Sequence, residues 1–141
     1  MKKLLLLLLT ACLLNGCAKS SYDAQAKEIL ADAQSRFDRL EKDLENTSTQ
    51  NEMCDVADER YRVWEDALNR IYEILENSLP ADELKALETD QKNWFEKKEK
   101  SVQEAGDTDE GGSMALLDSI ELNSSLTRER AYELAEKMNI Q

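Results

Sequence analysis

The sequence contains no histidine, and it has only one proline, four glycines and three valines among its 141 residues. Without histidine, the chain lacks the commonest general base and the most frequent transition-metal ligand, which argues against an enzyme and against a metalloprotein. Valine is scarce and no segment alternates apolar and polar residues with a period of two, so a β-sheet is not expected. The sequence therefore predicts an all-α protein with no catalytic residues and no cofactor.

The first seventeen residues combine two lysines with an apolar run. Lys2 and Lys3 precede the stretch Leu4–Leu14, which is too short to span a membrane but has the length of the apolar region of a signal peptide. A small residue, Gly16, then stands before Cys17, and this order resembles the lipobox at which a cysteine is acylated before cleavage. We therefore expect residues 1–16 to be a lipoprotein signal peptide and Cys17 to carry the lipid. The alternative is ordinary secretory cleavage, with Cys17 as a bystander.

The residues after Cys17 bear on where the protein is held. Stable anchoring needs more than one acyl chain, because a single chain binds a membrane only reversibly. Ala18, rather than aspartate, follows the cysteine, and by resemblance to lipoprotein sorting in Gram-negative bacteria this favours the outer membrane. The expected organisation is an acylated cysteine and tether over residues 17–21 and a folded domain over 22–141, in the cell envelope and facing the periplasm.

Acidic residues outnumber basic ones along the chain. Loss of residues 1–16 would remove two lysines and no acid, leaving 16 basic and 30 acidic residues and a formal charge near −14. Such a charge argues against nucleic acid as a partner. It favours a basic protein, because a field of one sign raises encounter rates with opposite charges.

Cys54 is the one thiol expected in the mature domain, since Cys12 lies in the cleaved segment and Cys17 would be lipidated. No disulfide can then form within the chain. Cys54 either pairs between chains or stays buried as a small apolar side chain, and its place in an apolar stripe favours burial.

Three long segments carry apolar residues at spacings of three and four, which is the pattern of an amphipathic helix. The first covers residues 22–44, the second Gln50–Glu76, and the third begins at Pro80 and ends near residue 104. Thr49 and Glu52 have the spacing of a capping box, in which both side chains satisfy free amides at a helix start.

Two shorter helices are expected after the third, one capped by Ser113 and one capped by Thr127. Short connections place neighbouring helices side by side and antiparallel. Asn69 and Gln91 lie on or next to apolar stripes, so we expect them to form hydrogen bonds that link the second helix to the third. The predicted architecture is a small antiparallel bundle of three longer and two shorter helices.

Several short motifs occur in a fixed order between residues 47 and 138. They are Thr49-Gln50, Met53-Cys54, Leu68-Asn69-x-x-Tyr72, Gln91-x-x-Trp94, Gly111-Gly112-Ser113 and Leu126-Thr127-x-x-Arg130. Together they resemble the LprI-like lysozyme-inhibitor family, formerly a domain of unknown function. The resemblance implies a partner of the lysozyme class. Members of that family usually carry further cysteines where this chain has Leu44, Val102 and Leu122, so apolar packing is expected to replace cross-links.

The function that these observations favour is an envelope lipoprotein that binds a basic, lysozyme-type peptidoglycan hydrolase and inhibits it. The alternative is a structural or assembly lipoprotein that binds another envelope protein through its helices. A loop between helices can enter a cleft that a helix face cannot. The candidate contact residues are therefore Asp107, Asp109, Glu110 and Ser113.

The same loop partly matches a calcium-binding loop that would run from Asp107 to Asp118. Gly112 fits the sixth place of such a loop, but Gly111 at the fifth place offers no side-chain oxygen, and Asp118 is shorter than the usual glutamate at the twelfth. The other interpretation is a plain acidic connection whose glycines separate two helices. We expect no bound metal.

Overall fold

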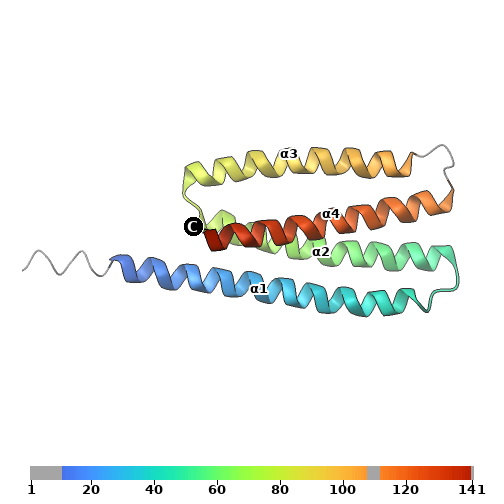
Figure 1. Ribbon diagram of the computed structural model, residues 1–141, viewed down its shortest axis with the longest axis horizontal. Coiled ribbons are helices and arrows are strands. Elements are labelled where there is room, and N and C mark those ends of the chain that lie inside the picture. The colour runs from blue at the N-terminus through green and yellow to red at the C-terminus, as the bar shows by residue number, and fades with distance from the viewer. Residues whose placement is uncertain (1–10, 108–111, 141) are drawn as a thin grey trace, which may run out of the picture.

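The computed structural model describes residues 11–107 and 112–140. Within these ranges the chain is entirely helical apart from short connections, and consecutive helices run in opposite directions (Figure 1). The all-α, antiparallel bundle predicted from the sequence is confirmed. Its helices are α1 (Ala11–Leu44), α2 (Gln50–Ser78), α3 (Ala81–Gly106) and α4 (Ser113–Ile140).

The prediction of two short helices at the C-terminal end is wrong, because α4 is a single helix from Ser113 to Ile140. Thr127 does not cap a helix. Its side chain is only 1% exposed inside the bundle. Buried residues occur from Ala115 to Met138, so packing against the other helices outweighs the weak helix propensity of the intervening asparagine and serines.

The capping box at the start of α2 is confirmed. The Glu52 amide donates to Thr49 Oγ1 at 3.3 Å, and the Thr49 amide donates to Glu52 Oε2 at 2.9 Å. The Ser48 amide also donates to that carboxylate, at 2.8 Å. These amide donors, led by that of Ser48, lower the pKa of Glu52 because they stabilise its charged form. The third helix begins at Ala81, one residue later than predicted, and Pro80 is the residue just before it.

The N-terminal part of α1 extends beyond the other three helices (Figure 1). Among the α1 side chains that the structure describes, the first buried one is Ala26, and it is followed by Ile29, Ala33 and Phe37. Residues 17–21, which the sequence assigns to the anchor and tether, continue α1 as helix. The expected signal peptide lies mostly outside the described residues. Across the described helices, none is long and apolar enough to cross a membrane.

The core lies where α2 packs between α1 and α4. Trp64, Ile71 and Leu75 of α2 and Leu134 of α4 are fully buried there. The third helix packs mainly on α4, not on its sequence neighbour α2. The expectation that Asn69 and Gln91 link α2 to α3 is therefore wrong: Asn69 is exposed, and Gln91 accepts a hydrogen bond from α4.

Candidate functional site

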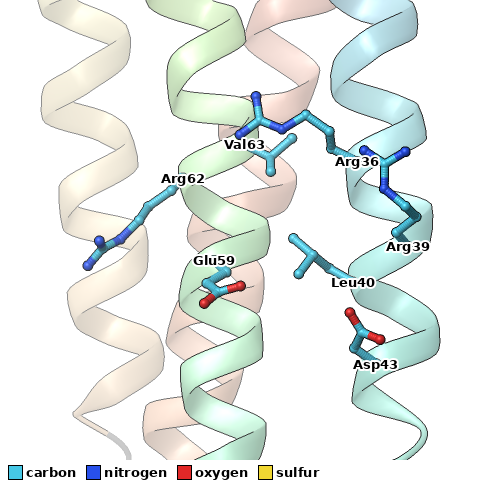
Figure 2. A pocket seen from close by; sticks show the side chains of 7 residues that line it. All are labelled: Arg36, Arg39, Leu40, Asp43, Glu59, Arg62 and Val63. Atoms are coloured by element: carbon cyan, nitrogen blue, oxygen red, sulfur yellow. The ribbon is translucent and has the colours of Figure 1, made fainter.

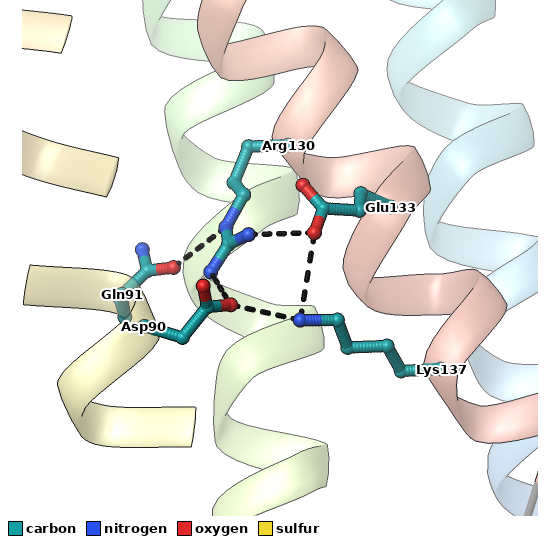
Figure 3. A network of polar contacts seen from close by, with 5 residues as sticks. All are labelled: Asp90, Gln91, Arg130, Glu133 and Lys137. Carbon is teal, nitrogen blue, oxygen red and sulfur yellow. Dashed lines mark hydrogen bonds and ion pairs between the residues drawn. The ribbon is translucent and has the colours of Figure 1, made fainter. Parts of the chain in front are cut away.

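A network of charged side chains joins α3 to α4 around Arg130, which is 3% exposed (Figure 3). The guanidinium donates to Asp90 Oδ2 at 2.7 Å, to Glu133 Oε1 at 2.8 Å and to Gln91 Oε1 at 2.9 Å. Lys137 Nζ lies 2.8 Å from Asp90 Oδ2 and 3.4 Å from Glu133 Oε1. Arg130 therefore has a carboxylate partner on each helix.

The pKa of Asp90, one of the two acids in this network, lies well below its usual range. Hydrogen bonds from Lys137 and Arg130 lower the pKa of Asp90 from 3.8 to about 2, because both donors favour the carboxylate. The Trp94 ring centroid lies 5.6 Å from the Arg130 guanidinium carbon, so a cation–π contact adds to the hydrogen bonds. These contacts hold α3 against the bundle.

Three of the family motifs meet around Arg130. Gln91 and Trp94 of one motif contact the arginine of another. Tyr72 belongs to the third motif. Burial raises the pKa of Tyr72, and the nearby positive charge of Arg130 opposes that rise. Two of the motifs that carry the family resemblance, Gln91-x-x-Trp94 and Leu126-Thr127-x-x-Arg130, thus form an internal contact between α3 and α4. Asp90 completes the contact and was missed in the sequence, although it precedes Gln91 directly.

A second cation, Lys98 of α3, is enclosed by aromatic rings between α3 and α2. Its Nζ lies 5.2, 5.5 and 5.6 Å from the ring centroids of Phe95, Trp94 and Tyr61. Burial, followed by the hydrogen bond to Glu65, raises the pKa of Tyr61. Tyr61 and Trp94 therefore pack against Lys98 between the two helices.

The predicted contact residues lie where α3 ends and α4 begins. Asp107 is exposed, and its amide donates to Gln103 O at 2.9 Å. Ser113 is the first residue of α4, whereas Asp109 and Glu110 lie outside the described residues. Residues 108–111 of the partial match to a calcium-binding loop lie outside them too. Among the described residues, no group of three or more acids or cysteines could hold a metal.

Two large apolar side chains are exposed next to this connection. Met114 is 60% and Leu116 is 56% exposed, in the first turn of α4. A Cβ built on Gly106 would lie 3.8 Å from Ser119 Cβ, so the last turn of α3 is close to α4 here. The end of α3 and the start of α4 lie at the end of the bundle opposite the start of α1 (Figure 1). We call Asp107, Met114 and Leu116 the distal patch.

A groove between α1 and α2 contains three arginines in this acidic protein. It has a volume of about 440 Å³. Arg62 lies 2.8 Å from Asp58, and Arg36 lies 3.5 Å from Asp66, so both charges are offset on the surface. Figure 2 shows Arg62 pointing away from the two arginines of α1. The side chains therefore do not converge on one ligand position. The groove is lined by Arg36, Arg39, Leu40, Asp43, Glu59, Arg62 and Val63.

Cys54, the thiol expected to be buried, is half-buried near the start of α2 and is free. It lies outside the core cluster. This is an intermediate position between the two fates considered from the sequence.

Comparison with known proteins identifies one family. A family model described as lysozyme inhibitor LprI matches residues 41–134, from the last turn of α1 into α4. No curated protein and no solved structure matches the chain. The matched range contains Asp90, Gln91, Trp94 and Arg130, and the family is one of inhibitors, which agrees with the expectation that the chain is not an enzyme. The chain belongs to the LprI lysozyme inhibitor family.

Proposed function

We propose that this protein is a lipid-anchored protein of the cell envelope that binds a lysozyme-type peptidoglycan hydrolase and keeps it from its substrate. Family membership supports the inhibitory role. The choice of surface rests on the distal patch, where exposed Met114 and Leu116 at the start of α4 share one end of the bundle with exposed Asp107 at the end of α3 (Figure 1). No residue is given a catalytic role.

The chemistry of the distal patch suits a basic partner. Burial of apolar side chains supplies much of the affinity at the centre of an interface, and opposite charge speeds the encounter and selects the partner. Asp109 and Glu110 add two acids to the same connection in the sequence, and Ser113 adds a hydroxyl. The contact that we propose is therefore made by Asp107, Asp109, Glu110 and Ser113 together with Met114 and Leu116.

The position of the patch suits an anchored inhibitor. A helix rises 1.5 Å per residue, so the stretch from Cys17 to Leu44 in α1 spans about 40 Å. With acyl chains on Cys17, the distal patch would be presented at about that distance from the lipid, where a hydrolase can reach it. An outer-membrane location facing the periplasm is part of the same proposal.

The direct test uses the mature domain, residues 18–141, with a basic lysozyme and a turbidity assay of cell-wall hydrolysis. We expect inhibition at micromolar concentrations of the domain. The inhibition should weaken as the salt concentration rises, because added ions screen the charges that steer the two proteins together. Binding of the domain to a basic protein of similar size without hydrolase activity is measured as the control for nonspecific attraction. Hydrolysis that is unchanged at a large excess of the domain would refute the inhibitor function.

Variants separate the function from the surface. The pair Met114→Ser and Leu116→Ser should weaken inhibition by at least tenfold, a loss of about 1.4 kcal/mol in binding. Phe95→Ser, at a residue 51% exposed on the flank of α3, is the matched control and should leave inhibition unchanged. If both variants inhibit like the wild type, the inhibitory function stands and the assignment of the binding surface to the distal patch is wrong. The alternative function is assembly with another envelope protein through helix faces. It predicts that hydrolysis is not inhibited and that capture of the partner depends on Phe95.

A further inference from the structure

A second pocket lies on the side of α4 that faces α1. It has a volume of about 180 Å³, far more than one water molecule needs, and side chains of α1, α2 and α4 enclose it. It belongs neither to the Arg130 network nor to the distal patch. It is lined by Phe37, Arg60, Glu121, Ser124, Ser125 and Arg128.

Two residues that line this pocket each carry a buried donor with no hydrogen-bond partner among the residues that the structure describes. Arg60 is 7% exposed; its Nη1 donates to Glu121 Oε1 at 2.5 Å, but its Nε has no acceptor. Ser124 is 2% exposed, and its Oγ has no partner either. A buried donor left unpaired is destabilising, so such groups are normally matched by an acceptor.

The pocket also holds more positive than negative charge. Arg128 donates to the neutral amide oxygen of Gln34 at 2.9 Å and has no carboxylate within ion-pairing distance among the described residues. Its guanidinium carbon lies 5.2 Å from the Trp64 ring centroid and 5.7 Å from that of Phe37. These rings fix the guanidinium at the pocket wall. Against the charges of Arg60 and Arg128 the pocket lining has one carboxylate, that of Glu121.

We propose that this pocket binds the carboxylate of a small ligand, such as the last residue of a short peptide. A planar carboxylate matches the paired donors of the Arg128 guanidinium at the pocket wall. Phe37 offers an apolar wall to the carbon that carries the carboxylate. One negative charge balances the pocket, whereas a phosphate dianion would place a second negative charge near Glu121. The proposal is independent of lysozyme inhibition.

Binding is measured by calorimetry on the mature domain at constant ionic strength. N-acetylalanine probes a terminal carboxylate, N-acetylglutamate amide probes a side-chain carboxylate, and inorganic phosphate probes the other common anion. N-acetylalanine amide has the same shape without the charge. Saturable binding of N-acetylalanine, weaker binding of phosphate and none of the neutral amide are the expected results. Tighter binding of N-acetylglutamate amide would make a side-chain carboxylate the ligand and would overturn the terminal-residue assignment.

Variants locate the binding. Arg128→Gln should weaken binding of N-acetylalanine at least tenfold. Arg128→Lys keeps the charge but lacks the planar fork, so it tests the same geometry if the glutamine variant does not fold. Arg39→Gln is the matched control, because Arg39 is an exposed α1 arginine that bonds only Ser35 within the described residues.

Several results would overturn the proposal. They are no saturable binding of N-acetylalanine by the wild type at millimolar concentration, equal binding of the neutral amide, and unchanged binding by folded Arg128 variants. Phosphate binding that is tighter than carboxylate binding would also reject the carboxylate assignment.

Discussion

Replacement of Arg130 by methionine tests whether the network in Figure 3 holds α3 on the bundle. The change removes three hydrogen bonds, two of them to carboxylates, each of which is worth about 1.5–3 kcal/mol. Asp90 and Glu133 are 48% and 51% exposed, so water replaces much of what they lose. We therefore expect the free energy of unfolding to fall by about 2–3 kcal/mol, below the 3–5 kcal/mol typical when one partner of a fully buried pair is removed.

The assay is urea unfolding followed by circular dichroism, together with amide hydrogen exchange resolved by helix. Exchange should quicken in α3 more than in α1, because the network connects α3 to α4. A double-mutant cycle with Asp90→Asn should give a coupling of about 1 kcal/mol. Arg62→Met is the control: its side chain is 71% exposed, so it should change stability by no more than about 0.5 kcal/mol. If Arg130→Met costs no more than this control, or α3 exchange does not change, the network does not hold α3.

Further outcomes follow from individual residues. The pKa of Asp90 is lowered from 3.8 to about 2, so its contribution to stability is complete above about pH 4 and is lost as pH falls towards 2. After allowance for its half-exposed side chain, acid titration should show a loss of about 1 kcal/mol that Asp90→Asn lacks. Leu68→Ala should cost about 2–5 kcal/mol in urea unfolding, because the side chain is 4% exposed; a cost below about 0.5 kcal/mol would move it to the surface. Cys17→Ala should abolish acyl labelling and release the protein from membranes, and unchanged membrane association would reject the anchor. Added reductant should leave the thermal midpoint unchanged, since Cys54 is free; a fall would reveal a disulfide between chains.

Local signals in the sequence were sufficient for the helices that begin at strong caps. Thr49 and Glu52 predict the start of α2, and the structure has it there. The end of the chain was harder, because Asn123, Ser124 and Ser125 are typical of a helix break, and only packing partners elsewhere in the chain keep them helical. Propensity alone cannot reveal such tertiary support.

One sequence alone does not show which helices pack against each other or which polar side chains pair between them. Gln91 stood out as a polar residue near an apolar stripe, but its partner on α4 could not be identified before the helices were assembled. Asp90 and Lys137 look like the many other charges on helix surfaces, and the same is true of Arg60 and Arg128. Only burial and distance distinguish them. The acidic connection after α3 stays a prediction from the sequence.

The overhang of α1 determines how the whole molecule can move if Cys17 is held in a lipid layer. From Cys17 to Gln25 the helix has no buried side chain among those described, and an isolated helix this short is only marginally stable in water. The overhang would then act as a flexible connection between the lipid anchor and the helical bundle. The distal patch would sweep a hemisphere of about 40 Å radius, in which one anchored molecule corresponds to a concentration on the order of 10 mM. Within that hemisphere a modest binding affinity is enough to capture a hydrolase. A hydrolase outside it cannot be reached, however high the affinity.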